Sequence, residues 1–383
     1  MGKEDLGQKF QEIYSRKPRF FRAPGRVNLI GEHTDYNEGF VLPMAIDREA
    51  IVAAADRRDT LIKIHALDVG ENAEFDLKSE AVKRRGSWLD FVEGVTRMLN
   101  EKFPLKNGAD ILFSSTVPIG AGLSSSAAIE IAVGFALLKL NEIGVNKVAL
   151  AKAAQKAEHE FVGAKIGIMD QLTSALGKAG HALLIDCRLL DPKAIPLNFK
   201  ETQIVVVDSG VKHDLATSEY NTRRAECEEA VQILQKKMPG VRALRDVSET
   251  EFARYENQLP DVIKRRCRHV IFENKRTQRA AEMLKLGKSD AFGRLMYESH
   301  ESLRDDYEVS SPELDFLVET AGSIEGVFGA RMTGGGFGGC TVNLVENKSL
   351  GSFESKVTAD YERRFSITPK IYPVKPSDGA SEI

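Results

Sequence analysis

The chain has 383 residues, of which 42% are hydrophobic and 28% charged, a composition that is ordinary for a globular protein and excludes disorder. Because one hydrophobic core seldom organises more than roughly 250 to 300 residues, we expect two domains with a cleft between them. The net charge is −3, with 53 Lys and Arg against 56 Asp and Glu. With no long run of like charge, a nucleic-acid partner and a membrane-surface partner are not expected.

The four cysteines and the amino-terminal residues indicate a cytoplasmic protein. Cys187, Cys227, Cys267 and Cys340 are far apart and form no CxxC pair, so we expect reduced thiols. The amino-terminal stretch 1–17 is charged throughout and lacks the apolar run of a signal peptide, and no later segment is long enough to span a bilayer. We expect a monomer without a membrane partner.

Hydrophobic periodicity predicts strands and helices along the chain. Strands are expected at 50–55, 61–66, 109–117, 182–187, 204–207, 341–345 and 370–374. The clearest helix, Ser125–Leu140, carries only two charged residues, so it must be buried. A second helix is expected to begin after the N-cap Asn146 and to continue through Val162.

The residue pattern of the sequence changes after residue 192. Long charged helices are predicted around 215–236, 262–284 and 289–304. We place a domain boundary near residue 195, which divides the chain into domains 1–195 and 196–383, both of mixed α+β type. The last residues, 374–383, are expected to form a loosely held tail.

The first unusual segment, 23–39, is rich in polar side chains. It reads APGRVNLIGEHTDYNEG and places five polar residues among apolar ones: Arg26, Glu32, His33, Asp35 and Asn37. Carboxylates, imidazoles and amides in such density suit a polyol, because a site built to bond specific hydroxyls rejects a wrong epimer. A polar surface loop is the alternative, but the interleaved apolar residues Val27, Leu29 and Ile30 argue against it.

The second segment, 118–128, reads PIGAGLSSSAA and joins a predicted strand to the buried helix. Its glycines let the backbone approach an anion, and the first amides of the helix point outward with a dipole that favours negative charge. We therefore expect a phosphate-binding loop. It is not a Walker A loop, since GxxxxGK[ST] does not occur. A glycine-rich turn with serine caps explains the same residues equally well.

The third segment, 331–340, reads RMTGGGFGGC and contains the GxGxxG spacing at Gly334, Gly336 and Gly339. A strand-like TVNLVE follows it, so the helix that a dinucleotide fold requires is missing. Such a costly glycine run is expected where backbone packs closely against another element or a ligand. A structural β-turn remains the alternative.

These segments resemble a known family. GRVNLIGEHTDYNEG followed by VLPMAID resembles the galactokinase signature, and PIGAGLSSSAA resembles the phosphate loop of the wider galacto-, homoserine, mevalonate and phosphomevalonate kinase superfamily. Segments 88–94, 157–171, 303–310 and 332–339 resemble the same family in the same order. The resemblance implies a two-domain α+β kinase fold with a ferredoxin-like carboxy-terminal domain. It also implies transfer of the γ-phosphate of ATP to the 1-hydroxyl of D-galactose.

The resemblance further implies roles for individual residues. Asp170 is expected to be the catalytic base and Arg26 its cationic partner. The expected sugar-binding residues are Glu32, His33, Thr34, Asp35, Gly167 and Tyr220. ATP is expected to bind at Gly120, Ala121, Gly122, Leu123, Ser124, Ser125 and Ser126, with Trp88 lining the adenine pocket.

A Mg²⁺ ion is expected to bind Ser126 and Glu158, directly or through water, as suits a hard cation that prefers oxygen. One position departs from the family pattern, because Ala66 stands where many relatives have a serine near the nucleotide. Three rivals stay open: an N-acetylgalactosamine kinase, an arabinokinase and a galactose sensor without efficient turnover. The complete serine-alanine stretch 124–128 favours an enzyme over the sensor.

Overall fold

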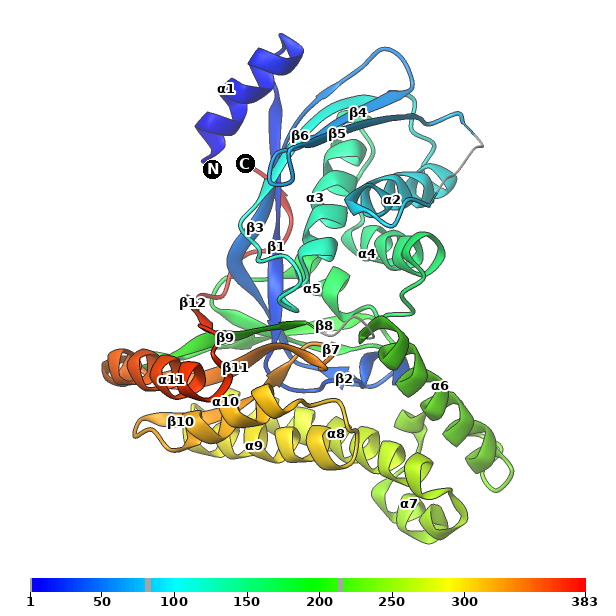
Figure 1. Cartoon of the computed structure of the whole chain (residues 1–383). Coiled ribbons are helices and arrows are strands. Elements are labelled where there is room, and N and C mark those ends of the chain that lie inside the picture. Colours follow the sequence, from blue (N-terminus) through cyan, green and yellow to red (C-terminus); the bar gives the residue numbers. More distant parts are fainter. Residues whose placement is uncertain (1, 80–83, 213–215) are drawn as a thin grey trace.

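A computed structural model describes residues 2–79, 84–212 and 216–383 (Figure 1). Its largest sheet has six strands in the order β13-β1-β3-β6-β4-β5. Their bounds are β1 (Arg19–Asn28), β3 (Pro43–Asp56), β4 (Leu61–Ala66), β5 (Glu71–Asp76), β6 (Ala109–Ser115) and β13 (Ser381–Glu382). The predicted strands at 50–55 and 61–66 are confirmed as part of β3 and as β4, and the strand predicted at 109–117 is confirmed as β6, which ends earlier, at Ser115.

Helices cover both faces of this sheet because its central strands alternate apolar residues between the faces. On β3, Val52 and Ala54 belong to the main hydrophobic cluster, whereas Ala53 packs with Leu6 and Phe10 on the opposite face. One face carries α2 (Trp88–Lys102), α3 (Ser125–Leu140), α4 (Lys147–Ala157) and α5 (Met169–Leu176), and the other carries α1 (Lys3–Tyr14), as Figure 1 shows. The predicted burial of α3 is confirmed.

The carboxy-terminal half contains a second, antiparallel sheet in the order β10-β11-β9-β12. The strands are β9 (Thr202–Lys212), β10 (Val327–Thr333), β11 (Gly338–Glu346) and β12 (Lys370–Val374). The helices are α6 (Ala216–Gln235), α7 (Glu249–Tyr255), α8 (Asp261–Lys285), α9 (Ser289–Asp305), α10 (Pro312–Gly322) and α11 (Leu350–Phe365). The chain order β-α-β-β-α-β and this strand order are those of a ferredoxin-like fold, as expected.

The main hydrophobic cluster continues past residue 195. Strand β9 sends Ile204 and Val206 into that cluster, while Val205 and Val207 face α10 and α11. A third sheet, β2 (Phe40–Val41), β7 (His181–Asp186) and β8 (Asp191–Pro196), contacts β3 of the largest sheet and helix α8. The boundary near residue 195 thus falls at the end of β8, and it stays a prediction.

The carboxy-terminal segment is fixed, so the prediction of a loosely held tail is wrong. Glu382 of β13 pairs with Phe21 of β1, Ala380 is buried, and the Gly379 amide donates to the Gly177 carbonyl at 2.8 Å. The edge of β1 offers unpaired backbone groups that the segment satisfies. A two-residue strand has no periodicity by which sequence could reveal it. Within the described ranges no helix is both long and apolar enough to cross a bilayer.

Candidate active site

The three unusual segments meet around one cavity of about 440 Å³. Residues from the signature segment, from the phosphate loop and from the glycine-rich segment 334–339 line it, together with the start of α5 and one turn of α6. The predicted site residues in this lining are Arg26, Glu32, His33, Asp35, Gly120, Gly122, Leu123, Ser124, Ser125, Ser126, Gly167, Asp170 and Tyr220. Residues distant in sequence thus form one chemical site.

Asp170 and Arg26 form the centre of the cavity. Arg26 is on β1 and Asp170 is in the first turn of α5, where the helix dipole favours an anion. The guanidinium donates from Nε to Asp170 Oδ1 at 2.8 Å and from Nη2 to Oδ2 at 2.9 Å. Its third nitrogen, Nη1, donates to the Gly122 carbonyl at 2.5 Å. One buried arginine therefore fixes the carboxylate relative to the phosphate loop.

The phosphate loop leaves the first amides of α3 without a side-chain cap. Ser124 occupies the N-cap position with φ +60°, and its hydroxyl donates to Asp170 Oδ2 at 2.5 Å but accepts no hydrogen bond from the helix amides. Gly120 and Gly122 also have positive φ, at +73° and +74°. This geometry argues against the serine-capped turn and favours an anion at the helix start.

The glycine-rich segment packs its backbone against the phosphate loop. A Cβ at Gly334 would lie 3.3 Å from the Gly122 carbonyl oxygen, and one at Gly339 would lie 3.6 Å from that of Ala121. The Cys340 thiol donates to the same Ala121 carbonyl at 2.8 Å. The expected close approach of backbone to another element is therefore confirmed.

Glu32 is buried in the wall of the cavity. Its carboxylate accepts hydrogen bonds from Asn28 Nδ2 and from the Gly334 amide, the latter at 2.5 Å, and Arg331 Nη1 lies 3.6 Å away. Burial raises the pKa of Glu32 to about 7, although Arg331 and Arg26 act in the opposite direction. The carboxylate is therefore rigidly held and titrates close to neutral pH.

Asp35 lies beside Asp170 and Gly167. Its Oδ1 accepts from the Tyr36 amide at 2.9 Å. Burial, together with the nearby charge of Asp170, raises the pKa of Asp35 to about 6. A Cβ at Gly167 would collide with the Asp35 carboxylate, so only glycine leaves room for that side chain.

His33 is a neutral ring whose two nitrogens are both engaged. Nε2 lies 3.2 Å from the Gly335 carbonyl, and Nδ1 lies 2.8 Å from the Tyr36 hydroxyl. Burial lowers the pKa of His33 to about 3, so the ring is uncharged at neutral pH. Because a carbonyl only accepts, Nε2 carries the proton and Nδ1 accepts from Tyr36. Tyr220 packs against this ring at a centroid distance of 5.3 Å.

Glu158 and Ser126 place two oxygens side by side behind the phosphate loop. The Ser126 hydroxyl donates to Glu158 Oε1 at 3.1 Å, and Gln171 Nε2 donates to the same atom at 3.2 Å. Burial, followed by the charge of Asp170, raises the pKa of Glu158 to about 7. The predicted α-helix through Val162 is wrong here, because α4 ends at Ala157 and a π-helical turn covers Glu158–Val162. Such turns are frequent at functional sites.

Four predicted site residues lie outside the cavity lining: Thr34, Ala121, Glu158 and Trp88. Thr34 donates to the carbonyls of Gly31 and Phe40, at 2.9 and 2.7 Å, and so closes the signature turn. Trp88 Nε1 donates to Glu71 at 2.6 Å, and its ring meets Phe113 edge-on at 5.6 Å. Ala66 is buried on β4. The ligand roles of the four residues outside the lining stay predictions.

Sequence reasoning missed several residues that form or support the cavity. Phe337 and Asn221 line it, whereas Asn28, Arg331 and Tyr36 hold Glu32 and His33 in place. Asn28 and Tyr36 lie inside the signature segment, so their position was an available signal. Nothing local shows that Arg331 is fully buried against a carboxylate.

Comparison with known proteins decides the family. The galactokinase galactose-binding signature matches residues 8–56, and the GHMP kinases N terminal and C terminal domains match 90–178 and 280–362. The galactokinase of Roseiflexus sp. (strain RS-1) is 47% identical over 380 residues, which cover 99% of this chain and 97% of that protein. The chain belongs to the galactokinase family.

Other galactokinases agree with this assignment. That of Chloroflexus aggregans (strain MD-66 / DSM 9485) is 50% identical over 361 residues, covering 94% of this chain and 92% of its own. The crystal structure of Lactococcus lactis galactokinase complexed with galactose superimposes with a TM-score of 0.95 at 34% identity and covers 99% of both chains. The expected family, fold class and ATP-dependent sugar kinase activity are therefore confirmed.

Proposed function

We propose that this galactokinase transfers the γ-phosphate of ATP to the anomeric 1-hydroxyl of D-galactose, giving galactose 1-phosphate and ADP. The observation that carries the proposal is the placement of Asp170. Its carboxylate accepts hydrogen bonds from Arg26 and Ser124 and lies between the phosphate loop and Asp35. The galactose named in the Lactococcus lactis complex supports the choice of sugar.

The chemistry follows from that placement. Asp170 takes the proton of the 1-hydroxyl as its oxygen forms a bond to the γ-phosphorus, while the bond from that phosphorus to the bridging oxygen breaks and ADP leaves. The Arg26 guanidinium and the free amides at the start of α3 oppose the negative charge on the phosphoryl oxygens. Positioning and electrostatics supply most of the catalysis in such a transfer.

The sugar is held by side chains that cannot easily reorient. Glu32 already accepts two hydrogen bonds from the protein, yet a carboxylate has about four acceptor sites and can accept from sugar hydroxyls as well. Asp35 and the Gly167 backbone border the same space. Since both His33 nitrogens are bonded within the protein, we propose that this ring shapes the pocket and does not itself bind a hydroxyl.

Mg²⁺ fits the oxygens of Ser126 and Glu158. Both are hard ligands, and a nearby cation would favour the charged form of a buried carboxylate whose pKa is raised to about 7. The described residues hold no cluster of three or more His, Cys, Asp or Glu able to bind a metal, so phosphates and water would supply the other ligands. When bound, the ion would neutralise charge on the β- and γ-phosphates.

A stoichiometric assay tests the proposed function. Purified protein is mixed with Mg²⁺, excess ATP and one of three sugars: galactose, N-acetylgalactosamine or arabinose. We expect many molecules of galactose 1-phosphate per chain and much slower reaction of the other two. Faster turnover of N-acetylgalactosamine or arabinose would overturn the choice of substrate. Tight binding of galactose and ATP by calorimetry, with less than one product molecule per chain, would identify a sensor.

A further inference from the structure

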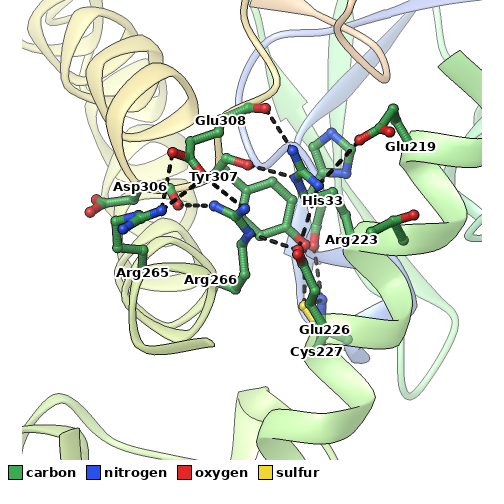
Figure 2. A network of polar contacts seen from close by, with 12 residues as sticks. His33, Glu219, Arg223, Glu226, Cys227, Arg265, Arg266, Asp306, Tyr307 and Glu308 are labelled. Atoms are coloured by element: carbon green, nitrogen blue, oxygen red, sulfur yellow. Dashed lines mark hydrogen bonds and ion pairs between the residues drawn. The ribbon is translucent and has the colours of Figure 1, made fainter. Parts of the chain in front are cut away.

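Behind the sugar side of the cavity, two buried arginines enclose the segment Asp306–Glu308 (Figure 2). We propose that one of them, Arg223, is a positioning residue that sets the geometry of the sugar side. The proposal rests on the proposed function, since it concerns how that reaction's sugar pocket is held. Arg223 does not line the cavity.

The two guanidiniums satisfy three successive backbone carbonyls. Arg223 donates from Nε to the Tyr307 carbonyl at 2.8 Å and from Nη2 to the Glu308 carbonyl at 2.9 Å, and Arg266 Nη1 donates to the Asp306 carbonyl at 2.7 Å. Glu308 has φ +55°, a conformation that is unfavourable for a residue with a side chain. The segment therefore depends on these donors to keep its shape.

Carboxylates orient the guanidinium of Arg223. Its Nη1 lies 3.5 Å from Glu219 and 3.6 Å from Glu226, both on α6. Glu226 also accepts from Arg266 Nε at 2.7 Å. The guanidinium of Arg223 is thus held in one orientation, toward the carbonyls of Tyr307 and Glu308 (Figure 2).

Tyr307 transmits the position of this segment to His33. Tyr307 is fully buried, and its ring lies 4.8 Å from the His33 ring. Its hydroxyl is 2.7 Å from that of Tyr36, whose proton is donated to His33 Nδ1, so Tyr307 donates to Tyr36. The Cys227 thiol lies 3.2 Å from the Tyr307 oxygen and completes a one-directional chain of hydrogen bonds. A shift of Tyr307 would therefore move His33.

Val309, the residue that follows this segment, holds the glycine-rich loop. The carbonyl of Val309 accepts from the Phe337 amide at 2.7 Å, and a Cβ at Gly336 would collide with that carbonyl. The Arg223 guanidinium also lies over the Phe337 ring, 5.6 Å from its centroid. Gly335 of this loop accepts a hydrogen bond from His33 Nε2. The contacts at both ring nitrogens of His33 therefore depend on residues 306–309.

Arg223 also belongs to the helix that carries Tyr220. The two residues are three positions apart on α6 and share a face. Tyr220 lines the cavity, and its ring lies 5.3 Å from those of His33 and Tyr36. One side chain therefore connects three walls of the sugar pocket, whereas none of these hydrogen bonds, ion pairs or ring contacts of Arg223 reaches the phosphate loop.

The test compares Arg223→Met and Arg223→Lys with the wild-type protein. We expect the KM for galactose to rise about tenfold or more in Arg223→Met, because one side chain would no longer hold Tyr307, Phe337 and Tyr220 in place. The KM for ATP should stay within about twofold. Arg223→Lys should also raise the galactose KM several-fold, since a lysine is a single-point donor that cannot bridge two carbonyls.

Arg265→Met is the matched control. Arg265 donates to the Glu308 carboxylate at 3.1 Å but contacts none of the three carbonyls, and it is more exposed. Its variant should leave both KM values within about twofold. Equal changes in the galactose and ATP constants of Arg223→Met would indicate general loosening and overturn the proposal. So would a lysine variant with wild-type galactose affinity, or failure of both variants to fold.

Equilibrium binding keeps this test separate from that of the proposed function. If the wild-type protein does not phosphorylate galactose, the function fails. Calorimetric Kd values for galactose and ATP in the three variants then still decide the positioning role. Selective loss of galactose binding in the Arg223 variants supports the role, and unchanged galactose binding contradicts it.

Discussion

The sugar side and the nucleotide side are built differently although they line one cavity. On the sugar side, Glu32 and His33 are buried, and each has two hydrogen-bonding contacts within the protein. On the nucleotide side, the phosphate loop presents exposed backbone at Gly120 and Gly122, and Ile119 is 62% exposed. The sugar side is fixed by side chains, and the nucleotide side is open backbone.

The difference follows from what each ligand requires. Epimers differ only in the direction of a hydroxyl, so a site distinguishes them only if its acceptors cannot follow the hydroxyl. A phosphate is recognised by charge and by several amides at once, which needs close approach more than fixed side chains. Changes on the sugar side should therefore affect specificity, and changes on the nucleotide side should affect metal and nucleotide use.

The largest expected effect is discrimination against glucose, which differs from galactose only at the 4-hydroxyl. We expect kcat/KM for glucose to be lower by about 10⁴ or more, because buried acceptors would be left unpaired. Parallel initial-rate measurements on the two sugars check this. Similar values of kcat/KM would show that the sugar side is not rigid in the way its contacts indicate.

Asp170 lies where the two sides meet, so its loss should affect turnover and leave both binding sites intact. Asp170→Asn keeps the shape but cannot accept the proton, and kcat should fall by roughly a hundredfold or more. Galactose binding, measured by calorimetry, should largely survive. A variant with near-normal kcat would reduce Asp170 to a group that only orients the hydroxyl beside Arg26.

Lowering the pH should weaken galactose binding because Glu32 becomes protonated. Its carboxylate accepts hydroxyl protons only when ionised, and burial raises its pKa to about 7, so galactose affinity should be full above that pH and fall below it. Calorimetry without nucleotide should show the galactose Kd rising about tenfold between about pH 8 and pH 6. Asp35, with a pKa of about 6, should add a further loss at lower pH.

The control for that titration is Glu32→Gln, which has no ionisable group at this position. Its galactose affinity should be weak and nearly constant between about pH 8 and pH 6. A pH dependence that survives in this variant would show that another group is responsible.

The smallest effect is expected for the metal ligands on the nucleotide side. Ser126→Ala and Glu158→Gln should each raise the Mg²⁺ concentration for half-maximal activity by about three- to fivefold, because phosphates and water supply most of the ligands. A titration of activity against free Mg²⁺ measures this concentration. The galactose Kd, which should not change, is the control. Unchanged midpoints in both variants would contradict the assignment.

Local pattern predicted much of the fold. The bounds of α3, β4 and β12 coincide with the expected segments, because periodicity and capping depend on residues a few positions apart. The side chain of Asn146 accepts from the Ala149 amide at 2.9 Å, as an N-cap should. The motifs likewise pointed to the residues that line the cavity.

Contacts between distant segments were decided only by the tertiary structure. The Gly334 amide and Glu32 are 302 positions apart, and the ring of Tyr307, which follows the end of α9, lies against that of His33. In sequence, Arg223 and Arg331 resemble ordinary surface charges, since nothing local indicates burial. The local sequence determined elements such as α3, β4 and β12 and the chemical groups of the site. Only folding determined their partners, because burial and hydrogen bonding at the cavity depend on which segments the fold brings together.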